Sequence, residues 1–271
     1  MDVKIIKVNA KKAFTSTKIP GANYVLNQYI GCQHACLYCY AKFVCRWHKH
    51  GEWGNWVIAK QNFPELVKKE RERVNGKVYM SSVSDPYQPI EKEIKLTREI
   101  LESMDKDTKL GILTKSDLVL RDIDLFKKFQ DVEVGLTINS VDGKMKRDVE
   151  PFSPTNEKRM DALKSLFENG IKTYAFISPI VPKLTDVEKI IEETKDFVDF
   201  YWFEFLNLRA SGKKFRSWLM ENYPESNEIL ANKEKMGKFV KEVMQTIKNS
   251  KVEVRGVCIH YPKIESLKFQ N

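Results

Sequence analysis

Three of the five cysteines, Cys32, Cys36 and Cys39, fall in one short segment directly after an apolar run. At C-x3-C-x2-C spacing, three thiolates can hold three irons of a cubane iron–sulfur cluster and leave the fourth iron without a protein ligand. An iron with an open position can bind and activate a small molecule. The segment therefore predicts a 4Fe-4S cluster with one reactive iron.

Zinc is the alternative metal for this segment. A structural zinc site usually takes four protein ligands in paired spacings such as C-x2-C. The three cysteines would need a fourth partner, which could be Cys45, His34 or His48. The spacing favours the iron–sulfur cluster, and we expect Cys45 and Cys258 to pack as small hydrophobic side chains.

Length, cysteine count and the start of the sequence indicate the class of protein. The chain has 271 residues, enough to bury a sizeable core as one α/β domain or two small ones. No apolar run reaches the roughly 20 residues that span a bilayer, and no signal-peptide pattern opens the sequence. Three crowded cysteines in an odd total indicate a reducing compartment. We therefore expect a soluble, cytoplasmic protein.

The charge balance indicates an anionic partner. Lysine and arginine number 46 against 37 acidic residues, which gives a net charge of +9. Nucleic acid is the usual anionic partner of such a chain. A chain rich in Lys, Glu and Ile can also carry charge over its whole surface, as many thermophile proteins do. The net charge is therefore compatible with a nucleic acid partner, but it does not show where a nucleic acid would bind.

The elements that must position the cysteines alternate between strands and helices. Six strands separated by helices of about ten to fifteen residues indicate βαβ crossovers and a parallel sheet. The predicted fold class is α/β, a partial (β/α)6 TIM barrel that forms three quarters of the closed eightfold barrel. Strands are expected at residues 24–30, 78–80, 110–113, 132–136, 173–177 and 197–206, and helices at 40–48, 62–73, 94–104, 119–129, 157–169 and 187–195.

Further elements flank the barrel. A leading strand is expected at residues 3–8, a helix at 227–249 and a last strand at 252–259. The predicted organisation is an N-terminal strand and loop (1–22), a barrel core (23–210) and a C-terminal helix and strand extension packed on the core (211–271).

Polar residues follow each predicted barrel strand. In parallel α/β architectures the functional groups gather at the carboxyl ends of the strands, so we expect these residues to face one mouth. At the last strand, Glu204, Asn207 and Arg209 could contact substrate or adenine, or could form an internal ion pair. The other strand-end segments are the cysteine loop, 81–87, 114–116, 137–140 and 178–179.

Several motifs together resemble the radical S-adenosylmethionine (SAM) superfamily and, within it, the branch related to spore photoproduct lyase, also described as DNA repair photolyase-like. The resemblance covers roughly residues 27–209 and so extends across the whole barrel. Its motifs are G-C-x-H-x-C-x-Y-C-Y from Gly31, S-D-P-Y-Q-P-I-E from Ser84, L-T-K-S from Leu113, R-D from Arg121, F-S-P from Phe152, S-P-I-V-P from Ser178 and E-F-L-N-L-R from Glu204.

The resemblance implies two cofactors, a 4Fe-4S cluster on Cys32, Cys36 and Cys39 and SAM on the remaining iron. Reductive cleavage of SAM would then release a 5'-deoxyadenosyl radical, with the protein positioning the cofactor and excluding water. An electron donor such as a ferredoxin or flavodoxin is implied as a partner. The oligomeric state stays open.

SAM contacts are expected from the strand ends. Lys115 would reach the SAM carboxylate as a flexible point charge, and Arg159 could do the same or lie solvated on its helix. The other expected contacts are Ser82 and Ser84 at the amino group, and Thr137 and Asn139 at the ribose.

Tyr38 and Tyr40 are the predicted catalytic residues, because aromatic hydroxyls near the cluster relay a hydrogen atom in the lyase relatives. Those relatives also use a cysteine after strand two, where this sequence has Ser82. A serine O–H bond is too strong to replace the thiol, which argues against the lyase reaction itself. Tyr38 could instead simply pack beside the cluster.

The predicted function is a radical SAM enzyme, a lyase or a transferase, that acts on a nucleic acid base in repair or modification. The tryptophans and basic residues of the loop at 46–56 are expected to face the substrate or to form a lid. The alternatives are a radical SAM enzyme on a peptide or small metabolite, and a metal-containing nucleic-acid-binding protein without catalysis.

Overall fold

The computed structural model describes residues 3–140 and 148–260. In these residues the main sheet has eight strands in the order β11-β10-β9-β8-β7-β6-β3-β2, and it does not close into a complete barrel. Strands from β3 to β11 pair in parallel, and β2 joins β3 in antiparallel. This arrangement confirms the predicted partial barrel. Its strands are β2 (Phe14–Ser16), β3 (Tyr24–Leu26), β6 (Val78–Met80), β7 (Leu110–Thr114), β8 (Val132–Ile138), β9 (Lys172–Ile180), β10 (Phe200–Phe205) and β11 (Val254–Cys258).

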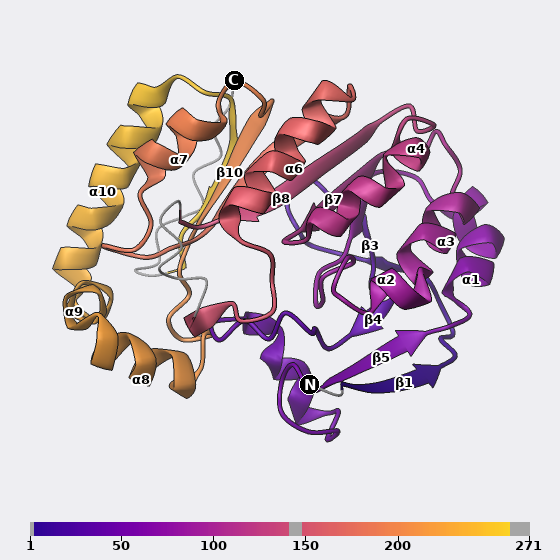
Figure 1. The fold of residues 1–271 in the computed structure, drawn as a ribbon, viewed down its shortest axis with the longest axis horizontal. Coiled ribbons are helices and arrows are strands. Elements are labelled where there is room, and N and C mark those ends of the chain that lie inside the picture. Colours follow the sequence, from indigo (N-terminus) through magenta and orange to yellow (C-terminus); the bar gives the residue numbers. More distant parts are fainter. Residues whose placement is uncertain (1–2, 141–147, 261–271) are drawn as a thin grey trace.

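Helices lie along the outside of the sheet, as Figure 1 shows. None of those in the described ranges is long and apolar enough to cross a membrane. They are α1 (Phe63–Glu70), α2 (Glu91–Ile94), α3 (Leu96–Ser103), α4 (Ile123–Phe126), α6 (Asn156–Glu168), α7 (Val187–Thr194), α8 (Lys213–Asn222), α9 (Pro224–Ala231) and α10 (Lys233–Ser250), with short 3-10 turns η1 (Tyr40–Arg46), η2 (Arg71–Arg73) and η3 (Asp117–Asp122).

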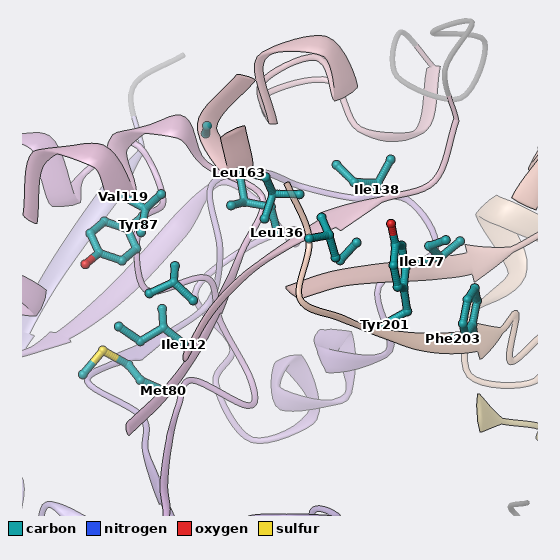
Figure 2. Packing of buried hydrophobic residues seen from close by; sticks show 14 of the residues in the cluster. Met80, Tyr87, Ile112, Val119, Leu136, Ile138, Leu163, Ile177, Tyr201 and Phe203 are labelled. Atoms are coloured by element: carbon teal, nitrogen blue, oxygen red, sulfur yellow. The ribbon is translucent and has the colours of Figure 1, made fainter. Parts of the chain in front are cut away.

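The main core lies between the strands and these helices, and Figure 2 shows part of it. Its apolar side chains come from register partners on neighbouring strands, such as Met80 with Ile112 and Ile138 with Ile177. Alternate residues of the same strands point to the opposite face of the sheet. On β8 and β9, Thr137 and Phe176 are paired in this way and face the barrel interior, where they line a cavity.

A second, small sheet holds the start of the cysteine loop. It has the order β1-β5-β4, with β1 (Lys4–Val8) parallel and β4 (Tyr29–Ile30) antiparallel to β5 (Trp56–Lys60). The leading strand is confirmed, but the single strand expected at 24–30 is wrong. It divides into β3 and β4, which belong to different sheets.

The structure corrects the expected loop at 46–56. Trp56 is fully buried and begins β5, where it packs with Val44 and Ile58 in a separate small core. Trp53 lines the cavity described below, and Trp47 is 69% exposed. The three tryptophans therefore have three different environments, and Trp56 has a structural role.

The C-terminal helix expected at 227–249 is two helices. The chain turns at Asn232, whose side-chain oxygen accepts hydrogen bonds from the Glu234 and Lys235 amides at 3.0 Å and caps α10. A helix that the sequence did not predict, α8, precedes them. Figure 1 shows α8, α9 and α10 along one side of the molecule, and Phe239 of α10 meets Phe205 of β10 edge-on. The predicted domain boundaries stay a prediction, and residues 261–271 of the extension lie outside the described part of the chain.

Gly31 connects β4 to the first cysteine in a conformation that only glycine adopts easily. Its φ is +85°, and a Cβ here would lie 2.5 Å from the Trp56 carbonyl oxygen. Because the obstacle is backbone of β5, it cannot rotate away. The entry to the cysteine loop therefore depends on a glycine at this position.

We expect Gly31→Ala to lower the free energy of unfolding by more than about 2 kcal/mol, because left-handed strain alone costs about 1–2 kcal/mol. Urea denaturation would measure it. Gly237→Ala is the matched control, because Gly237 lies within α10 with open space around its Cα. That control should stabilise the chain by about 0.5–1 kcal/mol. Equal effects of the two substitutions would contradict the steric argument.

Candidate functional site

An open cavity lies at the carboxyl ends of the barrel strands, with about 950 Å³ of empty space including its mouth. Of the predicted site residues, Asn139 and Arg159 are outside its lining. The predicted residues that line it are Cys32, Cys36, Cys39, Tyr38, Tyr40, Ser82, Ser84, Lys115 and Thr137.

All three cysteines of the loop line this cavity. Cys32 and Cys36 are buried, and Cys39 is partly buried. Burial raises the pKa of Cys39 to about 12 and that of Cys36 well above the ordinary thiol value. Thiolates would therefore form here together with the cation that binds them.

The chemistry of these donors fits an iron–sulfur cluster. Among the described residues, no three His, Cys, Asp or Glu side chains are placed to hold one metal ion. Three cysteines that line one shared cavity suit a cubane, in which each thiolate binds a different iron. The residues present therefore fit the 4Fe-4S group that the spacing predicts.

Side chains from outside the cysteine loop hold it in place. Gln88 accepts a hydrogen bond from the Gln33 amide at 2.9 Å and donates one to the Gly31 carbonyl at 3.3 Å. The Leu37 amide donates to the Val149 carbonyl at 2.7 Å. The S-D-P-Y-Q-P-I-E motif thus acts on the cysteine loop directly, through Gln88.

Lys42 ties the other end of the loop to the C-terminal extension. Its ammonium donates to the Leu37 carbonyl and, at 2.9 Å, to the Ser211 carbonyl. Burial lowers the pKa of Lys42, although the nearby Cys39 and Cys36 raise it. The only signal for this residue in the sequence was its position three residues after Cys39.

A buried His34–Asp85 pair lies behind the first cysteine. Nδ1 of His34 is 3.4 Å from Asp85 in an ion pair rather than a hydrogen bond of ordinary geometry. Burial lowers the pKa of His34, but Asp85 and Cys32 outweigh it and raise the pKa to about 9. Burial raises the pKa of Asp85, but His34 and hydrogen bonds from the Thr114 hydroxyl (2.6 Å) and Lys115 amide (2.8 Å) bring it down to about 2.

Asn27 organises the serine loop after β6. Its side-chain oxygen accepts hydrogen bonds from the Ser82 amide at 2.8 Å and the Ser81 hydroxyl at 3.0 Å. The Ser84 hydroxyl donates to the Tyr29 carbonyl at 3.1 Å. Both serines predicted to meet SAM are thus oriented by residues of the first strand region.

Glu150 joins predicted site residues that lie far apart in the sequence. Its fully buried carboxylate accepts hydrogen bonds from the Tyr38 hydroxyl, from Asn139 at 2.8 Å, from Ser153 at 3.2 Å and from the Arg159 guanidinium. The structure therefore brings Tyr38, Asn139 and Arg159 together around one acid. The sequence analysis did not predict a role for Glu150. The only signal for this residue in the sequence was its position two residues before the F-S-P motif.

The charges around Glu150 are compensated inside the protein. Arg159 is itself fully buried and also donates to the Thr137 carbonyl at 3.0 Å. Lys115 is less closely held, at 3.9 Å from the carboxylate. Burial raises the pKa of Glu150, but Arg159 and Lys115 outweigh it and lower the pKa to about 2.

Glu204 faces the cavity from β10. It accepts a hydrogen bond from the Ser178 hydroxyl at 2.7 Å, and its other oxygen lies 3.0 Å from the His260 ring. Asn207 lines the same cavity, whereas Arg209 does not. Tyr40 also borders it, with its hydroxyl donating to the Ser82 carbonyl and half of its surface exposed.

Comparison with known proteins agrees with the resemblance seen in the sequence motifs. The family described as "Radical SAM superfamily" matches residues 26–198. An uncharacterised protein of Methanocaldococcus jannaschii is 60% identical over 258 residues, which cover 95% of this chain and 98% of that protein.

Solved structures show a shared fold. A spore photoproduct lyase mutant with dinucleoside spore photoproduct has a TM-score of 0.65 at 16% identity. The match covers 93% of this chain and 82% of the lyase chain. SuiB of Streptococcus suis bound to S-adenosylmethionine has a TM-score of 0.54 at 13% identity, covering 89% of this chain and 52% of SuiB. At these identities the likeness is one of fold alone.

We expect Glu150→Gln to destabilise the chain by about 3–5 kcal/mol at pH 7, because it leaves a buried guanidinium without its counter-ion. Folding lowers the pKa of this acid from its ordinary 4.5 to about 2. Its stabilisation is therefore fully present above about pH 4.5 and is lost as the pH falls toward 2. Urea denaturation at several pH values should show the gap between wild type and variant closing over that range.

Glu168→Gln provides the control, because Glu168 is exposed near the end of the same helix as Arg159. Its effect should stay within about 0.5 kcal/mol at every pH. A Glu150→Gln effect no larger than this would show that the buried ion pair does not stabilise the fold.

Proposed function

The chain belongs to the radical SAM superfamily, and on this premise we propose that Cys32, Cys36 and Cys39 hold a 4Fe-4S cluster at which S-adenosylmethionine is reductively cleaved. The chain is therefore an enzyme of the radical SAM type. The observation that carries the assignment of the ligands is that all three cysteines line one open cavity at the strand ends. When bound, the cluster supplies the electron that breaks a carbon–sulfur bond of SAM.

The chain's own residues would bind and orient SAM in this cavity. Lys115 is the proposed partner of the SAM carboxylate, because it lines the cavity and its ion pair with Glu150 is long. Ser82 and Ser84 would serve the amino group, since Asn27 and the Tyr29 carbonyl already fix their loop.

The other proposed contacts are less direct. Thr137 lines the cavity and could meet the ribose, whereas Asn139 lies behind it against Glu150. Arg159 is committed to Glu150 and to the Thr137 carbonyl, so a contact with the SAM carboxylate would require it to leave a buried ion pair. Its geometry supports a positioning role for the wall that carries Tyr38 and Thr137.

The two tyrosines suit different tasks. The Tyr38 hydroxyl is held by Glu150, and its ring packs edge-on against Phe215 at 5.9 Å. Tyr40 borders the cavity and is 52% exposed, so it is the better placed of the two to meet a substrate and pass a hydrogen atom. Trp53 also lines the cavity and would exclude water from it.

For the substrate, we propose a base of a nucleic acid, acted on in repair or modification. The net charge of +9 supports an anionic polymer, and the open cavity can admit a base that has left its stack. The fold shared with spore photoproduct lyase, which the solved structure shows with a dinucleoside photoproduct, agrees with this proposal. A peptide substrate is the second candidate, since SuiB, whose fold is similar, is also solved bound to a precursor peptide.

Anaerobic reconstitution tests the cluster ligands. We expect brown protein with about four irons per chain that cleaves SAM to 5'-deoxyadenosine under reductant. Cys32→Ala should lose iron and SAM cleavage, because it removes one of the thiols lining the cavity. Cys45→Ala should retain both, since Cys45 lies on η1 outside the lining.

Isotope transfer tests the substrate. The deoxyadenosyl radical takes a hydrogen atom from its substrate, so the label belongs on the substrate. tRNA, damaged DNA and a peptide mixture, each deuterated at carbon, would be incubated separately with the protein, unlabelled SAM and reductant. We expect deuterium to pass from a polynucleotide into 5'-deoxyadenosine, and Cys32→Ala to abolish the transfer. Transfer of deuterium from peptides alone would refute the nucleic acid and favour the second candidate. A colourless zinc protein without SAM cleavage would refute the enzyme proposal as a whole.

A further inference from the structure

A second cavity adjoins the first on the side of the C-terminal extension. It has about 760 Å³ of empty space and lies between the end of β10 and helices α8 to α10. Its lining residues are Leu206, Asn207, Leu208, Arg209, Arg216, Leu230, Ala231, Met236 and His260. Neither the cluster ligands nor the expected SAM contacts belong to this lining.

The polar groups of the second cavity favour an anion. Arg209, Arg216 and His260 line it, and among the described residues no Asp or Glu does. Glu204 holds His260 from the side of the first cavity, at 3.0 Å. Two guanidinium groups on one cavity suit a phosphate, whose oxygens accept their hydrogen bonds in a fork geometry.

The rest of the lining is aliphatic. Leu206, Leu208, Leu230 and Met236 supply apolar surface, and no Phe, Tyr or Trp lines the cavity within the described part of the chain. Recognition of an unpaired base usually relies on aromatic stacking. Aliphatic surface beside guanidinium groups instead fits a sugar and its phosphate, which position a nucleic acid without reading its sequence.

The two cavities meet at Leu206 and Asn207, which line both of them. Asn207 is fixed by a turn in which its side-chain oxygen accepts the Ala210 amide at 3.1 Å and its carbonyl accepts the Ser211 amide at 3.0 Å. A ligand in the second cavity therefore lies directly beside a ligand in the first. Two neighbouring nucleotides of one strand would occupy the two cavities in this way.

We propose that the second cavity binds the sugar and phosphate of the nucleotide adjacent to the one whose base enters the first cavity. The inference rests on the proposed nucleic acid substrate and adds a backbone subsite to it. Arg216 and Arg209 bind the phosphate, and the aliphatic side chains contact the sugar.

Salt-dependent binding of a fluorescent single-stranded oligonucleotide to the reconstituted protein tests this subsite. Each phosphate contact on a single strand contributes about 0.7 to the slope of log affinity against log salt concentration. Arg216→Ala should reduce the slope by about 0.7, and Arg216→Glu should reduce the affinity further. Both changes are on an exposed side chain, and far-UV circular dichroism would show that the fold is kept.

Arg73→Ala is the matched control. Arg73 is an exposed arginine in η2, before the start of β6 and hence at the opposite end of the strands from the cavities. It should leave the slope unchanged. An Arg216→Ala slope equal to that of wild type would overturn the subsite while leaving the nucleic acid substrate in place. Absence of oligonucleotide binding by the wild-type protein would overturn both.

Discussion

The site depends on a loop that has almost no regular structure of its own. Between β4 and η1 the cysteine loop makes few backbone hydrogen bonds to itself, such as Ala35 to Cys32 and Cys39 to Cys36. Its shape is therefore set by side chains and backbone from elsewhere, above all Gln88, the Val149 carbonyl and Lys42. Buried polar groups must find partners, and here the partners are parts of the barrel. These hydrogen bonds to the barrel fix the conformation of the cysteine loop.

Two buried acids lie beside the cysteine loop, and each has its own cationic partner. Asp85 is neutralised by His34, and Glu150 by Arg159. Lys115 touches both acids, since its amide donates to Asp85 and its ammonium lies 3.9 Å from Glu150. Arg159 has a complete set of buried partners, so moving it would be costly. Lys115 is the cation that an incoming carboxylate could recruit with the least disruption.

Much of this could be predicted from the sequence, and the failures have physical causes. Buried parallel strands such as β7 and β8 are short continuous apolar runs, and these runs located them in the sequence. The strand β5 was missed because its residues follow a glycine-containing loop and pair with β1 and β4, which are distant in sequence. Glu150 was missed because an isolated acid carries no pattern. Its role comes from Tyr38 and Arg159, which only the fold brings to it.

Side chains fill the interior of the barrel at the end opposite the first cavity. At that end, Glu133 binds Lys77 and Arg255, and these charges occupy the space between the strands. Above them the Tyr174 ring fills the room left by Gly135, where a Cβ would come within 2.3 Å of the ring. The first cavity lies at the opposite end of the strands, at the mouth of the barrel. The extension borders that mouth with cationic and aliphatic residues, so a polymer held there would lie across the opening and present one unit to the thiols.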